Sequence, residues 1–378
     1  MRIYLDHNAT TPVRPSVAEA MSGVLRAEFG NPSSVYEEGA LARARVEAAR
    51  SKLARLLAVE PRSIRWTGGA TEANNTLLFG LLSPGDHVVT TEIEHPSVAA
   101  PLALLESRGV EVTRIAPDET GCVAAETVLG AVRSDTRLVS VIWANNETGS
   151  LQPVADIVDG CRARGVMTHS DATQAVGKAV IDLASVPLDF LSTSAHKLGG
   201  PKGVGALIVR GDPKLPAYLH GGGQEYGLRG GTENVAGIVG FGEACVLARE
   251  ELADRLVRHG ELRDRLWAGL QKRIDGLRWN GDRDRQLSNT LNVEFEGLAG
   301  EVLVQALDVE GIAVSAGAAC HSGSIEPSKI LLAMGRTSEQ ARASIRLSVG
   351  WGVDESQVDR VAEVLGTLVP RIRAAEAP

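Results

Sequence analysis

Leu138-Val139-Ser140-Val141-Ile142-Trp143 is a short apolar run, followed by a segment of helical length, Val154–Arg164, and then by a second short apolar run, Val166–His169. Short buried strands that alternate with helices are typical of βαβ units, which build a mostly parallel sheet with helices on both faces. This stretch therefore predicts an α/β fold.

The same alternation extends from this stretch toward both ends of the first 230 residues. Another segment of helical length is Val98–Arg108, and helical spacing of apolar residues is also seen from Val17 to Leu25. The remaining short apolar runs are Ile64–Trp66, His87–Thr90, Val110–Ile115 and Ala206–Val209. We therefore expect one large unit built around a mostly parallel sheet.

The pattern changes after about Gly231. Residues 233 to about 274 predict a long helix that is broken or bent near His259-Gly260. The elements predicted after it are a strand at Thr290–Phe295, a helix at Glu301–Leu307, a strand at Ile345–Ser348 and a terminal helix at Glu355–Ala374. This order predicts a second, smaller α+β unit.

Composition excludes several classes of protein. The chain has 378 residues, with 39 Lys or Arg and 47 Asp or Glu, so its formal net charge is −8. This mild acidity gives no reason to expect nucleic acid or an anionic membrane as a partner. A hydrophobic share of 44% excludes extensive disorder. No run is long and apolar enough to span a bilayer, and the N-terminus does not resemble an export signal.

Cysteine usage points in the same direction. The four cysteines stand at positions 122, 161, 245 and 320, so the chain has no C-x-x-C pair, and no metal site is expected. Few, scattered cysteines without an export signal indicate a reducing compartment, the cytoplasm. Cys122, Cys161 and Cys245 lie in helix-like or strand-like contexts and are predicted to be inert.

The segment Thr67-Gly68-Gly69-Ala70-Thr71-Glu72 lies between a predicted strand and a predicted helix. Its glycines permit a sharp turn, and Thr71 is a suitable N-cap for the helix. The free N–H groups at a helix N-terminus favour a phosphate. Taken alone, the segment favours a strand-to-helix turn without a ligand, because such turns are common in α/β proteins.

Ser192-Thr193-Ser194-Ala195-His196-Lys197 ends a predicted strand and precedes a glycine-rich turn. A desolvated lysine has a lowered pKa and can form a Schiff base with a carbonyl compound. Lys197 is the candidate for that role, with Lys202 as a competitor of the same type. The plain alternative is a lysine at the end of a strand that reaches solvent.

Two further polar residues follow strands. Asp171 lies beyond the run at Val166–His169, at the edge where ligand crevices open in α/β sheets. An aspartate there can pair with the pyridine nitrogen of pyridoxal phosphate, or it can simply cap a helix. His95 follows His87–Thr90 and can stack on a flat ring, or it can satisfy a local hydrogen bond.

Three candidates remain: Cys320 and Arg346 lie in the second unit, and a glycine-rich segment lies just before that unit. Cys320 stands among very small residues in Ser315–Ser324, which indicates an accessible loop. An accessible cysteine thiolate can act as a nucleophile. The plain alternative is a free surface cysteine without a chemical role. Arg346 lies inside a predicted strand, where its guanidinium can bind a carboxylate or form a structural ion pair. The glycine-rich segment from His220 to Thr232 indicates turns or close backbone approach.

Together these motifs resemble those of cysteine desulfurases of the NifS/IscS type, which are class V aminotransferase-like enzymes that depend on pyridoxal phosphate. The matching pieces run in order along nearly the whole chain: Tyr4–Pro12, Phe29–Ser34, Ala70–Glu72, Asn145–Gly149, Asp171–Lys178, Ala195–Lys197, Gly203–Leu207 and Ser315–Ser328. The resemblance implies the α/β fold type I of pyridoxal phosphate-dependent transferases. It implies a large cofactor-binding domain at 15–258 and a smaller α+β domain formed by 1–14 and 259–378.

The resemblance also implies roles for matching residues. Lys197 would hold the cofactor covalently, and Cys320 would be the nucleophile that forms a persulfide. Asn146 and Arg346 would bind the carboxylate of the substrate, L-cysteine. Thr232 would reach the cofactor of a partner subunit, which implies a homodimer. The expected cofactor-binding residues are Ala70, Thr71, His95, Asn146, Asp171, Gln174, Ser194, His196, Lys197 and Thr232, of which His95 is also catalytic.

The implied reaction converts L-cysteine to L-alanine and leaves a persulfide on Cys320. The sulfur would then pass to an acceptor protein of unknown identity, in iron–sulfur cluster assembly or thio-modification. Several positions depart from the family: Tyr226 and Gly230 stand where Arg and Ser are common, His321 follows Cys320 in place of Ser or Thr, and Gly350-Trp351-Gly352 replaces Gly-Arg-Phe.

Two other functions fit the same motifs. A selenocysteine lyase, or another class V lyase or aminotransferase, would not need Cys320 as a nucleophile. A non-catalytic scaffold of a sulfur pathway would keep the fold without the chemistry, but the complete set of Lys197, Asp171, Gln174 and His95 argues against it.

Overall fold

The computed structural model describes residues 2–211, 213–316 and 326–376. Its larger sheet has the strand order β2-β8-β7-β6-β5-β3-β4. Within the group β3 to β7, every pair of neighbouring strands is parallel. Strand β8 runs antiparallel to both of its neighbours, β7 and β2. The strands are β2 (Ile64–Thr67), β3 (His87–Thr91), β4 (Glu111–Ile115), β5 (Thr136–Ser140), β6 (Met167–Asp171), β7 (Phe190–Ser194) and β8 (Gly205–Val209).

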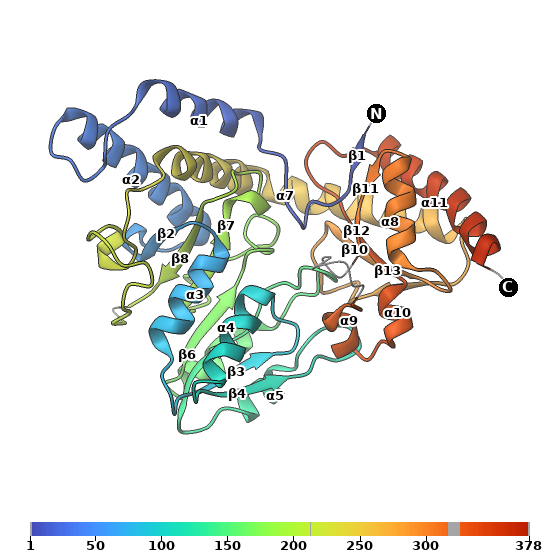
Figure 1. The fold of residues 1–378 in the computed structure, drawn as a ribbon, viewed down its shortest axis with the longest axis horizontal. Coiled ribbons are helices and arrows are strands. Elements are labelled where there is room, and N and C mark those ends of the chain that lie inside the picture. The colour runs from blue at the N-terminus through green and yellow to red at the C-terminus, as the bar shows by residue number, and fades with distance from the viewer. Residues whose placement is uncertain (1, 212, 317–325, 377–378) are drawn as a thin grey trace.

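Helices cover both faces of this sheet (Figure 1). The side chains of consecutive strand residues point to opposite faces of the sheet, as two residues of β7 illustrate. Leu191 packs in one apolar cluster with α2 and α7, whereas Phe190 packs in another with α3 and α4. The strand is therefore buried on both sides, as a parallel strand between two helical layers is. These helices are α1 (Pro15–Ala27), α2 (Glu37–Leu57), α3 (Ala70–Leu81), α4 (Pro96–Glu106), α5 (Ala125–Gly130), α6 (Val154–Arg162) and α7 (Val235–Gln271).

A smaller antiparallel sheet follows in the chain, with the strand order β12-β13-β10-β9. Strand β1 (Ile3–Tyr4), at the start of the chain, pairs in parallel with β11 (Ile312–Ala313) beside it. The remaining strands are β9 (Leu277–Asn280), β10 (Thr290–Phe295), β12 (Ser315–Ala316) and β13 (Ser344–Ser348). The helices of this part are α8 (Gly300–Val309), α9 (Lys329–Ala333), α10 (Ser338–Arg342) and α11 (Glu355–Glu376).

The predicted fold class is confirmed, and the predicted strands lie within three residues of the observed ones. The strand predicted at Leu138–Trp143 is the least accurate of these predictions, because β5 already ends at Ser140. The break predicted at His259-Gly260 is wrong, since α7 continues through both residues. A glycine inside a helix costs only about 1 kcal/mol. Apolar residues on either side of it, such as Cys245 and Leu266, anchor the helix in two different cores.

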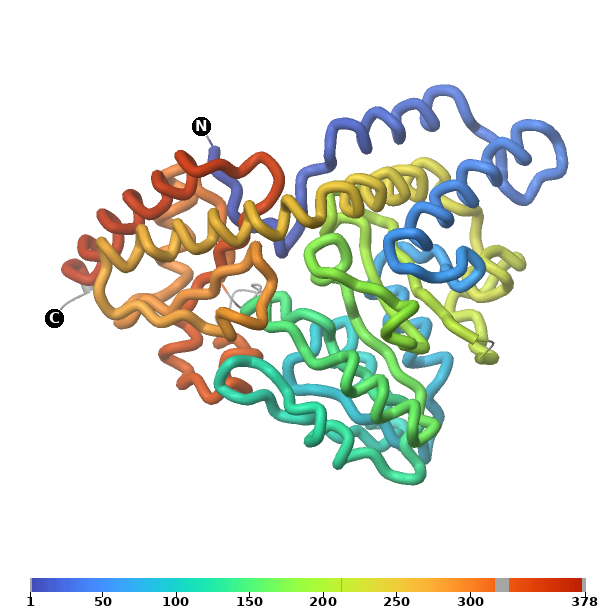
Figure 2. The backbone as a smooth tube through the Cα atoms, turned by 180° about the vertical axis from the view of Figure 1, so that it is seen from behind, coloured from blue at the N-terminus to red at the C-terminus, as the bar shows by residue number. Residues whose placement is uncertain are grey.

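We propose the domain division that the resemblance implies, 15–258 against 1–14 with 259–378. Ile3 and Leu5 support it, because they share one apolar cluster with Leu262–Ile274 and with α11. Helix α7 passes from one part to the other, and both chain ends lie at the smaller part (Figures 1 and 2). No helix in the described ranges is long and apolar enough to cross a membrane.

Candidate active site

The candidate residues of the large sheet gather at the carboxyl ends of its parallel strands. Asp171 is the last residue of β6, Lys197 follows β7 in a short 3-10 turn (Ala195–Lys197), and Asn146 and His95 lie beyond β5 and β3. In a parallel sheet these ends share one edge, and ligand crevices open there. The fold thus brings together four residues that are far apart in the sequence.

Asp171 is held rigidly as a hydrogen-bond acceptor. It is only 3% exposed. Its Oδ2 accepts from Nδ2 of Asn74 at 2.8 Å, and its Oδ1 accepts from the backbone N of Thr173 at 3.0 Å. Both bonds fix the orientation of the carboxylate. Asn74, on α3, is fully buried and also donates to Oγ of Ser97 at 2.8 Å.

His95 is tied to the same network. It is the N-cap of α4, and its Nδ1 accepts from the backbone N of Ser97 at 3.1 Å, while Oγ of Ser97 lies 2.8 Å away. Burial lowers the pKa of His95, so the neutral ring prevails, and its proton is on Nε2 because Nδ1 is an acceptor. Ser97 therefore orients both the histidine and, through Asn74, the aspartate.

Lys197 has the environment of a reactive amine. Its Nζ donates to the backbone carbonyls of Asn8 at 2.6 Å and Ala9 at 2.7 Å. Burial, and then the positive charge of Arg346, lower the pKa of Lys197 to about 8. Lys202, the competing candidate, is exposed. The geometry therefore favours Lys197 over Lys202 as the amine that reacts with a carbonyl compound.

The predicted phosphate cradle forms at the N-terminus of α3. The helix begins at Ala70 and its N-cap is Gly69, so the prediction that Thr71 is the N-cap is wrong. Gly69 has φ of +155°, which is why a glycine, and not a threonine, occupies the cap. Thr71 is exposed in the first turn, where backbone N–H groups have no helical partner.

Two further members of the predicted cradle lie nearby. A Cβ placed on Gly69 would be 3.9 Å from Oγ of Ser194, so β7 ends close to the start of α3. Nδ1 of His196 lies 3.2 Å from Oγ1 of Thr10. Burial and the charge of Lys197 lower the pKa of His196 to about 4, so it is neutral and can offer only one N–H.

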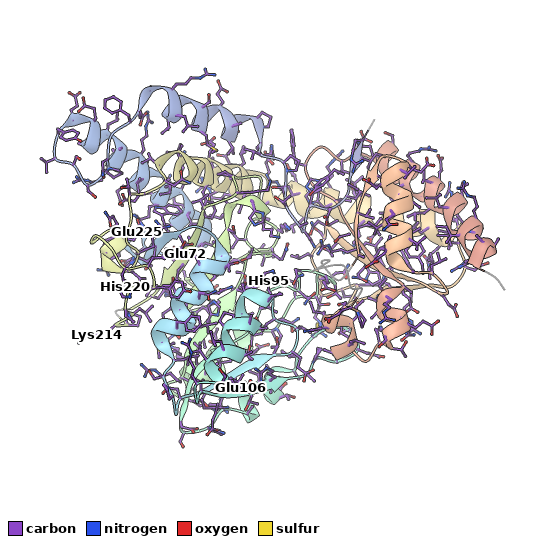
Figure 3. All side chains as sticks on the ribbon, viewed as in Figure 1. Glu72, His95, Glu106, Lys214, His220 and Glu225 are labelled. Carbon is purple, nitrogen blue, oxygen red and sulfur yellow. The ribbon has the colours of Figure 1, made fainter. Side chains whose placement is uncertain are left out.

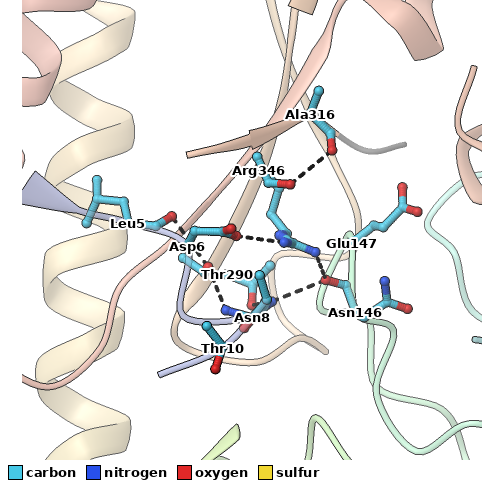
Figure 4. Close-up of polar contacts among 12 residues, drawn as sticks. Leu5, Asp6, Asn8, Thr10, Asn146, Glu147, Thr290, Ala316 and Arg346 are labelled. Carbon is cyan, nitrogen blue, oxygen red and sulfur yellow. Dashed lines mark hydrogen bonds and ion pairs between the residues drawn. The ribbon is translucent and has the colours of Figure 1, made fainter. Parts of the chain in front are cut away.

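Arg346 forms a structural ion pair, one of the two roles that the sequence left open for it (Figure 4). Its Nη2 donates to Oδ1 of Asp6 at 2.7 Å and its Nη1 to the carbonyl of Asn146 at 2.8 Å. Nε of Arg346 and Oδ1 of Asn146 are buried without a partner among the described residues. A carboxylate bound here would share the guanidinium with Asp6, so that role stays a prediction.

Asn8 is the residue that sequence reasoning missed. Its carbonyl accepts from Lys197 and from Nε2 of Gln174, at 2.6 and 2.8 Å. Its side chain donates to Oγ1 of Thr290 and accepts from Nζ of Lys178 at 3.1 Å. Lys178 in turn donates to Oε1 of Gln174 at 2.8 Å. Asn8 lies within the motif Tyr4–Pro12, but only the fold shows that this segment crosses the site.

Cys320 lies outside the described residues, but the chain on either side of it is anchored at the site. Ser315 pairs with Arg346 across β12 and β13. Beyond the gap, Oγ of Ser328 donates to Oε2 of Glu147 at 2.5 Å, next to Asn146. Cys122, Cys161 and Cys245, which the sequence predicted to be inert, are buried, and burial raises the pKa of each thiol.

The two departures near the glycine-rich segment have local structural reasons. The Tyr226 ring lies 4.2 Å from the guanidinium of Arg65 and 5.5 Å from that of Arg50. A Cβ on Gly230 would approach the Cα of Gly221 to 2.7 Å, so a serine does not fit this backbone. Arg229, which lies between Tyr226 and Gly230 in the sequence, forms an ion pair at 2.9 Å with Glu72 of α3. Glu72 is labelled in Figure 3. Thr232 is exposed.

The residues fit the cofactor that the resemblance implies. Pyridoxal phosphate requires a phosphate cradle, an amine of lowered pKa and an acceptor for its pyridine nitrogen. Helix α3 with Ser194, the amine of Lys197 and the carboxylate of Asp171 supply these three groups at one sheet edge. Asn146 Oδ1, buried without a partner, is a further polar atom that a bound group can satisfy.

Comparisons with known proteins show the family of this chain. Residues 3–361 match the sequence profile of the family described as aminotransferase class-V. Two relatives, both named cysteine desulfurase IscS, come from Methylobacillus flagellatus and Clostridium botulinum. They are 44% and 40% identical to this chain, over 98% of it and over 93% and 95% of their own lengths.

Solved structures give the same result. One described as a NifS-like protein superimposes with a TM-score of 0.92 at 36% identity, covering 98% of this chain and 100% of its own. A second, SspA in complex with cysteine, has a TM-score of 0.80 at 34% identity and covers 92% and 99%. DndA from Streptomyces lividans has a TM-score of 0.78 at 40% identity and covers 90% and 97%.

Proposed function

Because this chain belongs to the aminotransferase class-V family and has relatives named cysteine desulfurase at 40–44% identity, we propose that it is a cysteine desulfurase. It converts L-cysteine to L-alanine and takes the sulfur atom as a persulfide on Cys320. The observation that carries this proposal is the placement of Lys197, with its pKa lowered to about 8, at the same sheet edge as the buried carboxylate of Asp171.

We propose pyridoxal phosphate as the cofactor. When bound, it withdraws electrons from the Cα of the substrate. Asp171 holds the pyridine nitrogen, Gln174 donates to the phenolic oxygen, and His95 stacks on the ring. The first turn of α3, with Ser194 and His196, binds the phosphate. The amine of Lys197, once free, takes the proton from the Cα of the substrate.

Arg346 and Asn146 bind the substrate carboxylate in this scheme, and Cys320 receives the sulfur. A bond forms between Sγ of Cys320 and the substrate sulfur while the Cβ–S bond of the substrate breaks. The electron pair of that bond stays on Cβ, which takes up a proton, and Lys197 returns a proton to Cα to give L-alanine. The persulfide sulfur then passes to an acceptor protein, in iron–sulfur cluster assembly or in thio-modification.

We also propose that the enzyme is a homodimer in which Thr232 reaches the phosphate site of the partner subunit. Two features of this chain support that arrangement. Thr232 is exposed within its own protomer. The ion pair between Arg229 and Glu72, at 2.9 Å, ties the segment before Thr232 to the first turn of α3, so each protomer presents this segment in a fixed position.

The proposed function is tested by incubating the cofactor-loaded protein with L-cysteine and a thiol reductant and measuring L-alanine and sulfide over time. We expect the two products to form in equal amounts. Turnover of L-selenocysteine without turnover of L-cysteine would instead show a selenocysteine lyase. Failure to take up the cofactor would show that the chain lacks the chemistry of its family.

We predict that Asn74 is a positioning residue that acts through Asp171. Replacing it by Leu removes the donor 2.8 Å from Oδ2 of Asp171. A hydrogen bond to a charged group contributes about 1.5–3 kcal/mol, so we expect alanine formation to fall at least about tenfold. We also expect the pH titration of the visible absorbance of the bound cofactor to shift, because the carboxylate of Asp171 is no longer fixed in position against the pyridine nitrogen.

Asn75→Leu is the matched control, because Asn75 is adjacent on α3 but donates to the backbone carbonyl of Thr71. It should leave the spectral titration unchanged. A merely structural role for Asn74 would lower the melting temperature of Asn74→Leu without moving that titration, which would contradict the prediction.

A further inference from the structure

A cavity of about 270 Å³ lies between the N-terminal segment and α7. Its walls are the segment 7–14, the middle of α7, and residues 349–353. Figure 2 shows the N-terminal chain meeting α7 near the middle of that helix. Lys197 lines this cavity as well, whereas Asp171, His95 and Ser194 do not. The cavity is thus a neighbour of the candidate active site and not the site itself.

The charge lining this cavity is strongly unbalanced. Apart from Lys197, which is reserved for the cofactor, four basic residues line it, against the carboxylates of Glu251 and Asp254; the basic residues are Arg14, Lys178, Arg255 and Arg258. Glu251 is already engaged, because Arg14 binds it through two bonds of 2.8 and 2.9 Å and Arg255 through bonds of 2.6 and 2.9 Å. Among the described residues, Asp254 is thus the one other carboxylate in the lining that faces Lys178 and Arg258.

Lys178 is a buried ammonium group without a carboxylate partner among the described residues. Its Nζ donates to two amide oxygens, Oδ1 of Asn8 and Oε1 of Gln174. An ammonium group has three N–H donors, so one is free to bind an oxygen atom in the cavity. Burial, followed by the positive charges of Lys197 and Arg346, holds the pKa of Lys178 well below its usual range.

Arg258 and the two histidines complete this picture. Arg258 is exposed on α7 and forms no ion pair with any residue in the described ranges. Burial and then the charges of Arg255 and Lys178 lower the pKa of His259 to about 4. Burial and then the charge of Lys178 lower the pKa of His7 to about 3. The basic groups around the cavity therefore repel one another, and an anion would relieve that repulsion.

From this geometry we infer that the cavity is a binding site for a small dianionic oxyanion, held by Lys178 inside and by Arg258 at the rim. A dianion matches the excess of positive charge better than a monocarboxylate does. At about 270 Å³, the space far exceeds the roughly 10–15 Å³ that one water needs. The inference does not rest on the proposed function, because neither Asp171 nor His95 lines the cavity.

The test is calorimetric titration of the cofactor-loaded enzyme with sodium sulfate, at an ionic strength held constant with sodium chloride. The bound cofactor keeps the phosphate cradle occupied, so that sulfate cannot bind there. We expect saturable binding of one sulfate per chain. Arg258→Ala should weaken it about tenfold, since a bond to a charged group contributes at least about 1.5 kcal/mol. Lys178→Gln should abolish it.

Arg249→Ala is the matched control, because Arg249 is also exposed on α7 but does not line the cavity. It should bind sulfate like the native enzyme. Equal sulfate affinity in Arg258→Ala and native enzyme, or no saturable binding at all, would overturn the inference. Sodium acetate is titrated in parallel, and acetate binding as tight as that of sulfate would overturn the assignment to a dianion. Loss of alanine formation with sulfate binding intact would contradict only the proposed function.

Discussion

Lys197→Ala is expected to lose covalent attachment of pyridoxal phosphate and to lower alanine formation by about a thousandfold or more. Loss of proton transfer from a positioned base alone costs about 10²–10⁴-fold. Lys197 is suited to both roles because, among the residues that the structure describes, its amine donates to the backbone carbonyls of Asn8 and Ala9 and to no carboxylate that would stabilise its charge. Borohydride reduction followed by peptide mass spectrometry measures the attachment.

Lys202→Ala is the control for this variant. Lys202 lies five residues after Lys197, in the glycine-rich turn that follows it, but it is exposed. It should retain native attachment and native turnover. Cofactor found on Lys202, or normal turnover by Lys197→Ala, would show that the lysine has been assigned wrongly.

The same lysine gives a pH dependence whose direction follows from its lowered pKa. The neutral amine is the nucleophile, and at pH 7.5 a lysine with a pKa of about 8 is about one-quarter neutral. A lysine at the usual value near 10.4 would be only about 0.1% neutral. The rate at which the cofactor-free protein captures pyridoxal phosphate should therefore rise through about pH 8 and level off above it. A rate that still increases steeply at pH 10 would contradict the lowered pKa.

Much of this site could be predicted from sequence because the sheet organises it. Asp171 and Lys197 each follow a short apolar run, and a parallel sheet places the carboxyl ends of such runs at one edge. The strand signals were clear, because these strands are buried on both faces and read as continuous apolar runs. Local chemistry at the strand ends thus translated directly into proximity.

What the sequence could not show are contacts made across long separations. Asp6 and Arg346 are 340 residues apart, so the ion pair between them became visible only once β13 and the N-terminal segment were placed. The same holds for Asn8, whose carbonyl accepts from Lys197, and for Asn74, which donates to Asp171. An asparagine gives no sequence signal for such a role, since it is equally common in turns.

Two local predictions failed because tertiary packing overrode local preference. Thr71 is a good N-cap by type, but the sharp turn at Gly69 starts the helix two residues earlier than a threonine cap at position 71 allows. Gly260 weakens a helix by type, but α7 is held on both sides of it by packing against two cores. In both cases a local preference of about 1 kcal/mol was outweighed.

Cys320→Ser is expected to lower alanine formation by about a thousandfold or more while the visible spectrum of the bound cofactor stays native. A serine hydroxyl cannot accept sulfur as a persulfide, and removal of a nucleophile of this kind typically costs several orders of magnitude. The chain enters and leaves the segment that carries Cys320 at Ser315, paired with Arg346, and at Ser328, bonded to Glu147. Both anchors lie beside the residues proposed to bind the substrate carboxylate.

Cys122→Ser is the matched control, because Sγ of Cys122 lies 3.6 Å from the carbonyl of Leu151 and a hydroxyl can keep that contact. The remaining cysteines are poor alternatives as nucleophiles, since burial raises the pKa of the Cys161 thiol to about 11 and that of Cys245 further. Mass spectrometry after L-cysteine treatment should find one added sulfur atom on the peptide of Cys320 in native protein and in Cys122→Ser. Full alanine formation by Cys320→Ser would mean that the sulfur leaves the substrate without a persulfide on this residue, as in a lyase.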